Sequence, residues 1–150
     1  MKEELEQKLV EKYPLILKDY RGDCQKTCMA FGIECSDGWY DMLDLAMQKI
    51  QYVCDMSKRD DRNIQLVADQ IKEKFGTLRF YYTVDGIYED NDIVAERILS
   101  DIVSQTENLS SSICEDCGNR RTARLSSKGG WMRTVCEECA EKAGYVAKDE

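Results

Sequence analysis

The chain has 150 residues, 43% of them hydrophobic and 33% charged, which is enough for one core with a small appended module. Its formal charge of -8 disfavours general binding to nucleic acid unless the cationic residues gather on one face. No stretch reaches the ~18 apolar residues of a membrane helix, and the highly charged N-terminus is unlike a signal peptide. We therefore expect a cytoplasmic protein that makes no membrane contact.

The first part of the chain is predicted to contain helices on either side of an irregular segment. Apolar residues at three-to-four spacing predict a helix over residues 1–20, which Pro14 should divide into two pieces. Residues 21–38 contain three glycines and no regular period, so we expect them to be irregular. The same helical spacing predicts the clearest helix over residues 37–58.

The period changes to alternation over residues 64–84, which is typical of strands. We predict two antiparallel strands joined near residues 75–76, with three side chains facing the helices, namely Leu78, Phe80 and Tyr82. A further apolar stripe predicts a helix from one of residues 90–92 to about Ser110. Three consecutive serines then form a hinge into the C-terminal part.

Two C-x2-C pairs, separated by eighteen residues, are the strongest signal in the sequence. With no histidine in the chain, they predict a zinc site of four thiolates: Cys114, Cys117, Cys136 and Cys139. Strands over residues 120–125 and 131–135, followed by a helix that begins with the second pair, predict a treble-clef arrangement. Four protein ligands close the tetrahedral shell, which is typical of a structural site. An iron–sulfur cluster or a rubredoxin-type iron is the competing interpretation.

These elements together predict an α+β protein. Its helices should pack on an antiparallel β-hairpin in an acidic domain of residues 1–110, because residues 111–150 are neutral as counted and the first 110 carry the whole charge. Residues 111–150 form the predicted zinc-binding module, whose metal should supply much of its folding free energy.

The remaining cysteines leave two interpretations open. A second metal site could be formed by Cys24, Cys28, Cys35 and Cys54. Their spacing matches no standard zinc knuckle, and buried inert thiols explain them more simply. A disulfide scaffold would also suit an even count of eight, but the C-x2-C spacing and the missing signal sequence favour metal.

The predicted C-terminal hairpin contains basic residues around an aromatic one, which could hold a nucleic-acid strand by phosphate contacts and stacking. The candidate nucleic-acid-binding residues are Arg120, Arg121, Arg124, Lys128, Trp131 and Arg133. The alternative is a solvated hairpin with Trp131 packed against the zinc knuckle, because neighbouring glutamates cancel the charge.

The sequence contains no recognisable catalytic set, since histidine, a glycine-rich phosphate loop and a serine nucleophile elbow are all missing. One acidic group lies near a predicted pocket, formed by Glu34, Asp37 and Asp41 beside Trp39. Capping and exposed charge explain this group more simply. Three cations of the central hairpin could bind an anion, although protection of an edge strand is the plainer account: Lys72, Lys74 and Arg79.

Several stretches together resemble a group of small uncharacterised proteins encoded by bacterial phages and prophages. They are residues 31–35, 37–40, 71–81 with the sequence IKEKFGTLRFY, 114–118, 130–131 and 136–140. The resemblance implies a phage context, action in the cytoplasm of a bacterial host, and a four-cysteine zinc site. It implies no activity.

The leading hypothesis is a zinc-stabilised phage accessory protein that binds and modulates a host macromolecule, such as a defence or replication factor. Inhibition is the expected effect, and a host protein is the expected partner, met by the acidic domain. The first alternative is a nucleic-acid-binding zinc-finger regulator that uses the basic hairpin. The second alternative is an enzyme with an unrecognised active site. The sequence leaves the oligomeric state open.

Overall fold

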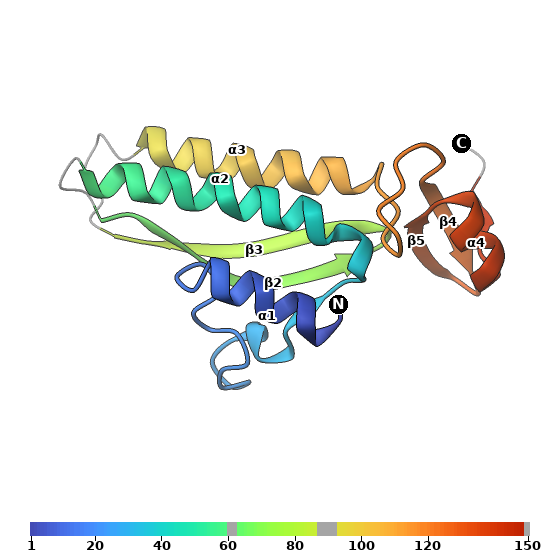
Figure 1. Ribbon diagram of the computed structural model, residues 1–150, viewed down its shortest axis with the longest axis horizontal. Helices are drawn as coiled ribbons and strands as arrows, with labels where there is room; N and C mark the ends of the chain where they lie inside the picture. The colour runs from blue at the N-terminus through green and yellow to red at the C-terminus, as the bar shows by residue number, and fades with distance from the viewer. Residues whose placement is uncertain (60–62, 87–92, 149–150) are drawn as a thin grey trace.

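A computed structural model of the chain describes residues 1–59, 63–86 and 93–148, and its architecture is α+β, as predicted. Two long helices lie along one face of a long β-hairpin, and a small sheet with a short helix lies at one end of it (Figure 1). The predicted cap at residues 90–92 falls outside the described residues. Among the described helices, none combines the length and apolarity needed to cross a membrane.

The N-terminal segment is less helical than predicted. Helix α1 (Glu3–Lys12) ends at Tyr13, and the residues after Pro14 form turns instead of a second helical piece. The residue before a proline is pushed away from helical backbone angles, and Tyr13 has φ -127° and ψ 58°. Residues 21–38, predicted to be irregular, contain two short 3₁₀ helices, η1 (Cys28–Phe31) and η2 (Asp37–Trp39), and the two-residue strand β1 (Ile33–Glu34).

The central part agrees closely with the predicted order of elements. Helix α2 (Tyr40–Arg59) leads into strands β2 (Gln65–Lys74) and β3 (Thr77–Asp85), and helix α3 (Ile93–Ser110) follows. β2 and β3 are antiparallel, with an irregularity between Ala68 and Gln70, while β1 pairs in parallel with β2. The sheet order is therefore β1-β2-β3.

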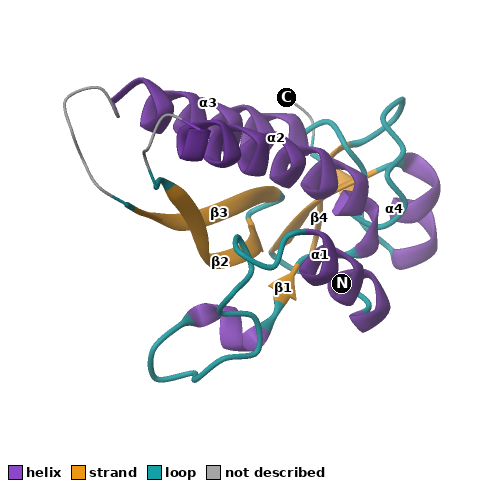
Figure 2. Cartoon of the chain, turned by 60° about the vertical axis from the view of Figure 1, so that its left-hand side comes forward, coloured by secondary structure: helices purple, strands orange, loops and turns teal. Residues whose placement is uncertain are grey.

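The main core lies between the two long helices, the sheet and the N-terminal segment (Figures 1 and 2). Trp39, the last residue of η2, is fully buried, and so are Leu43, Met47 and Ile50 along α2. Leu78 and Phe80 of β3 are buried in the same cluster, and Tyr82 packs against it. Alternate side chains of a strand point to the same face, so the alternation of apolar residues in β3 places Leu78, Phe80 and Tyr82 together on the core side of the hairpin.

The C-terminal part, called here the metal module (residues 113–148), forms a second small sheet of order β5-β4-β6. It contains β4 (Arg124–Lys128), β5 (Trp131–Val135), helix α4 (Glu137–Ala143) and β6 (Val146–Ala147). β4 starts later than predicted, and β6 was not predicted at all. A two-residue strand has too short an alternation to be visible in a sequence.

Candidate metal centre

The structure gathers the four predicted ligands into one cluster. The sulfur atoms of Cys114, Cys117, Cys136 and Cys139 all lie within 4.8 Å of one another. Cys114 and Cys117 lie in a tight turn closed by the Gly118 amide, which donates to the Cys114 carbonyl at 2.8 Å. Cys136 is the N-cap of α4 and Cys139 lies in its first turn, so the cluster adjoins the positive end of the helix dipole.

Four sulfurs this close cannot all carry charge without a counter-ion. Burial and the neighbouring thiols raise the pKa of Cys139, and burial raises that of Cys117. Burial opposes ionisation of Cys136 as well, but hydrogen bonds from the Cys139 amide and the other thiols outweigh it and lower the Cys136 pKa. A divalent cation would relieve this repulsion, because a coordinating thiol loses its proton outright. The cluster is therefore arranged to coordinate a metal ion.

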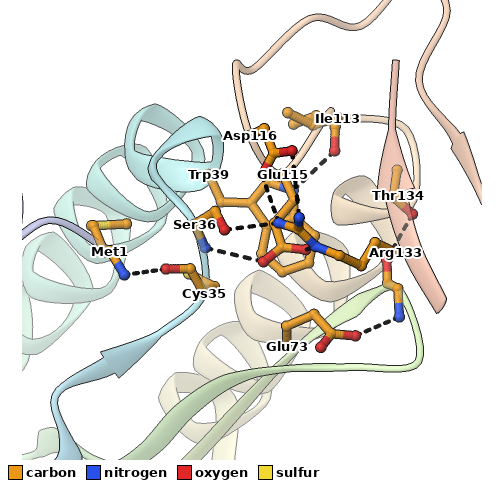
Figure 3. A network of polar contacts seen from close by, with 11 residues as sticks. Met1, Cys35, Ser36, Trp39, Glu73, Ile113, Glu115, Asp116, Arg133 and Thr134 are labelled. Carbon is orange, nitrogen blue, oxygen red and sulfur yellow. Dashed lines mark hydrogen bonds and ion pairs between the residues drawn. The ribbon is translucent and has the colours of Figure 1, made fainter. Parts of the chain in front are cut away.

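The metal module is joined to the rest of the protein by a dense polar contact, called here the module interface: residues 36–39 and Gly76 on one side, residues 113–118, Arg133 and Thr134 on the other (Figure 3). Glu115 is 3% exposed, and its carboxylate accepts a hydrogen bond from the Ser36 amide at 3.0 Å. The Gly38 amide donates to the Glu115 carbonyl at 2.7 Å. The Trp39 indole donates to the Ile113 carbonyl at 2.9 Å.

Arg133 is the cation of this interface (Figure 3). Its guanidinium lies 2.9 Å from a Glu115 oxygen and 2.7 Å from an Asp116 oxygen, and it donates to the Ser36 hydroxyl at 2.8 Å. Burial opposes the charged form, but the two carboxylates outweigh it and raise the Arg133 pKa above its ordinary value. A buried carboxylate is retained here because it is both paired and hydrogen-bonded.

Two glycines permit the close approach of the main chain across the module interface. A Cβ atom added to Gly38 would lie 2.3 Å from the Cys114 carbonyl oxygen and 2.5 Å from the Gly118 nitrogen, both backbone atoms. At the tip of the central hairpin, the Gly76 carbonyl accepts from the Thr134 hydroxyl at 2.7 Å. A Cβ atom on Gly76 would lie 2.4 Å from a methyl group of Leu125.

The structure does not bring together the predicted second metal site. Cys24 and Cys28 are exposed on the segment before β1, whereas Cys35 and Cys54 are buried. Within the described residues, these four cysteines do not lie together as a group of potential ligands, whereas the four C-terminal cysteines do. Burial raises the Cys35 pKa to about 12, and it also raises the Cys54 pKa, so both buried thiols are held in the neutral form.

The predicted nucleic-acid-binding hairpin is largely engaged in contacts of its own. Arg133 belongs to the module interface, Arg124 pairs with Glu137 at 3.0 Å, and the Lys128 amine donates to the Ala143 carbonyl at 2.6 Å. Arg120 and Arg121 lie before β4, both exposed. Trp131 is 74% exposed at the hairpin tip, so it does not pack against the knuckle as the alternative interpretation had it.

The predicted acidic group does not converge on one cleft. Trp39 is fully buried with its indole nitrogen bonded, so it lines no open cavity. Asp37 accepts from the Lys2 amide at 2.8 Å, and Glu34 lies on β1, where it accepts from Gln70 at 3.3 Å. Asp41 is exposed on the first turn of α2.

The module interface could not be predicted from the sequence because its parts are far apart in the chain: Ser36 and Arg133 differ by 97 in residue number. A signal was nevertheless present. Residues 37–40, 71–81 and 114–118, three of the motifs quoted in the sequence analysis, supply Gly38 and Trp39, Gly76, and the first C-x2-C turn, and the structure places all of them at this interface.

No protein-family model, no curated protein and no solved structure matches this chain.

Proposed function

We propose that this chain is a zinc-stabilised phage accessory protein that acts by binding a host protein, with inhibition as the outcome. Its metal module would be a treble clef with a structural zinc ion, since a knuckle, a hairpin and a helix N-terminus supply the four thiolates. A closed shell of four thiolates offers no position for a catalytic water. The phage context is supported by the resemblance described above.

The observation that carries the proposal is an exposed apolar groove along the outer side of α2 and α3. Its two ends are lined by Leu45 and Leu109 and by Tyr52 and Val53, with Ile102 between them. Leu45 is 48% exposed, Tyr52 66% and Leu109 40%. Large apolar side chains gathered on one surface mark an interaction site more often than chance exposure does.

The spacing of these side chains suits a helix as occupant. Leu45 and Tyr52 are seven residues apart on α2, and Ile102 and Leu109 are seven apart on α3. Each pair therefore spans about 10 Å along its helix, at ~1.5 Å per residue. A bound amphipathic helix repeats its own apolar anchors at the same interval. We therefore propose that the host protein contributes an amphipathic helix to this groove.

The groove is not acidic, so it differs from the acidic docking surface expected from the sequence. The charged residues that line the groove are Lys49 and Arg120, both cationic. An apolar contact should tolerate salt, whereas contact through acidic groups would weaken as salt screens it. Retention of the partner at about 0.5 M salt supports the groove, and loss by that concentration supports the acidic surface instead.

Affinity capture from a bacterial host lysate, followed by direct binding of the purified captured protein, tests this proposal. We expect the double change Leu45→Asp with Tyr52→Asp to abolish binding, because it places two charges in the apolar groove. Both side chains are exposed, so their replacement leaves the core intact. The matched control is Phe31→Asp, which places a charge on a 60% exposed side chain away from the groove and should bind as the unchanged protein does.

Two results would refute the proposal. One is equal binding by the double variant and the unchanged protein. The other is self-association through the groove. In that case sedimentation would show a dimer of the unchanged protein, the double variant would be a monomer, and no host protein would bind.

A further inference from the structure

The central hairpin has two unlike faces. α2 and α3 lie along one face (Figures 1 and 2), and the register of the strands places a polar set of side chains on the other. Lys72 is the cross-strand partner of Arg79, Gln70 of Tyr81, and Lys74 of Thr77. Since cross-strand partners share a face, these residues form one strip, called here the cationic strip, with Lys72, Lys74, Arg79 and Tyr81 as its members.

Among the described residues, the cations of this strip form no ion pair with a carboxylate. Lys72 lies directly opposite Arg79, and like charges in that position destabilise a β-ladder. Lys12, by contrast, is paired with Asp44, and Lys18 with Asp85. Across the part of the chain that the structure describes, the ion pairs include none made by Lys72, Lys74 or Arg79. An anionic ligand would remove the repulsion.

The nearest carboxylates do not cancel this charge by direct contact. Glu34 is level with Lys72 on β1 but accepts a hydrogen bond from Gln70. Glu73 shares the helix-facing side with Leu78 and accepts from the Gly76 amide at 2.6 Å. Arg79 donates to the Thr77 hydroxyl at 2.7 Å and to the Leu78 carbonyl at 2.9 Å, and the Lys74 amine lies 5.7 Å from the centre of the Phe75 ring. These contacts are to neutral groups, so they leave the positive charge of the strip uncompensated at the metal-module end of the sheet.

Three exposed aromatic rings accompany the cations. Tyr81 is 44% exposed on the strip, Phe75 is 64% exposed at the hairpin tip, and Trp131 is 74% exposed at the tip of the β4–β5 hairpin. Phe75 and Trp131 line the same cavity of about 180 Å³, together with Lys74. The Gly76–Thr134 hydrogen bond and the Leu125 contact hold the tip of the central hairpin against strands β4 and β5.

Phe75 occupies its tip position at a cost. Its φ is 53°, in the left-handed region that glycine and asparagine adopt far more readily than a bulky residue does. The side chain is 64% exposed, so it gains little burial in return, and its ring lies 5.7 Å from the Lys74 amine. Such an outlier points to a role in binding, because folding alone would favour another residue.

We propose that the cationic strip, with Phe75 and Trp131, is a binding site for single-stranded nucleic acid. Lys72, Lys74 and Arg79 contact phosphates, and the aromatic rings stack with bases. This site is separate from the α2–α3 groove in its residues and in its ligand. In this proposal the nucleic-acid surface is the cationic strip and not the C-terminal basic hairpin predicted from the sequence. Trp131 is the one residue that the two candidate surfaces share.

The pattern favours a single strand over other polyanions. Exposed aromatic faces give an acidic peptide little, whereas every base presents a face that stacks on them. From Tyr81 to Thr77 the strip extends about 13 Å, at ~3.3 Å per residue, which suits the small sites of single-strand binders. The net charge of -8 is carried largely by other surfaces, and salt screens charges more than about 10 Å away.

The test is titration of the full metal-loaded protein with a fluorescent oligothymidylate and an oligouridylate of about 15 nucleotides at ~50 mM salt. We expect saturable binding and quenching of tryptophan fluorescence. The quenching reports Trp131, because the other tryptophan, Trp39, is fully buried. The double variant Lys72→Gln with Arg79→Gln should lose at least about tenfold in affinity, with a salt slope lower by ~1.4, at ~0.7 per phosphate contact.

Two matched variants separate charge and stacking from folding. Lys8→Gln with Arg97→Gln removes one lysine and one arginine, both exposed, from other surfaces and should leave the affinity unchanged. Phe75→Asn suits the left-handed backbone, so it should raise the melting temperature while weakening binding about tenfold. A purely structural role for Phe75 would move the two measurements in the same direction.

Three outcomes would overturn the proposal. These are no binding of either oligonucleotide at low salt, equal affinity for the Lys72/Arg79 variant and the unchanged protein, and equally tight binding of polyglutamate without a change in Trp131 fluorescence. The last result would assign the strip to acidic peptides. If the Lys72/Arg79 variant unfolds in circular dichroism, the exposed change Lys74→Gln with Tyr81→Ala takes its place and is expected to weaken binding as strongly.

Discussion

Gly38 has no room for a side chain, and its neighbours cannot yield. The atoms that a Cβ would meet belong to the backbone of the first C-x2-C turn. Gly38→Ala should therefore cost about 3 kcal/mol, at the upper end for overpacking, and should weaken metal retention. Chemical denaturation and metal content after dialysis measure the two effects. Gly129→Ala is the control, since its Cβ meets nothing within 4 Å and only the local left-handed backbone costs about 1 kcal/mol.

Arg133 and Arg124 offer a matched pair of substitutions on adjacent strands. Arg133→Met should destabilise the protein by about 3 kcal/mol, because it leaves Glu115 buried and unpaired. Arg124→Met removes an ion pair whose side chains are 56% and 63% exposed, so it should cost less than about 1 kcal/mol. If urea denaturation shows equal losses of unfolding free energy for the two variants, the burial of Glu115 does not add to the cost of losing its arginine.

At the scale of elements, α1 is tied to α2 by a titratable contact. Asp44 lies 2.8 Å from the Lys12 amine and accepts from the Tyr13 hydroxyl at 2.6 Å. Burial alone would raise the Asp44 pKa, but these two hydrogen bonds outweigh it and lower the pKa below 3.8. The contact therefore stabilises the fold fully above the ordinary pKa and is lost as pH falls through the lowered one.

Asp44→Asn should accordingly reduce the melting temperature at neutral pH, and the difference from the unchanged protein should shrink below about pH 4. Thermal unfolding followed between pH 3 and 7 measures it. Asp101→Asn is the control, because this exposed carboxylate on α3 makes no ion pair among the described residues. A constant difference across the whole range would contradict the assignment.

Elements with a sustained period were predictable, and those without one were not. α2, β3 and α3 follow from their apolar spacing, and the four-cysteine cluster follows from its C-x2-C pairs. β1 and β6 have two residues each and depend on distant partners. The pairing of Arg133 with Glu115 could not be predicted, because nothing in the local sequence distinguishes this arginine from Arg124.

At the scale of the whole molecule, the module interface couples the four-cysteine cluster to the main core. Removal of the ion by a chelator should therefore lower the stability of the entire chain in one transition, since structural zinc contributes on the order of 10 kcal/mol to small modules. Trp131→Phe leaves Trp39 as the sole tryptophan, and its indole donates to the metal module. Near-ultraviolet circular dichroism of Trp39 should change with chelation. An unchanged signal and two separate melting steps would show that the two parts are independent.

The two sides of the module interface are far apart in the chain, so the ribosome makes them at different times. During synthesis the Trp39 indole precedes its partner, the Ile113 carbonyl, by 74 residues. At roughly 5–20 residues per second, the ribosome takes about 4–15 s to supply that partner. For that interval the nascent N-terminal part exposes donors that only this later segment satisfies, so a chain released before residue 113 should be recognised by chaperones and proteases as incomplete.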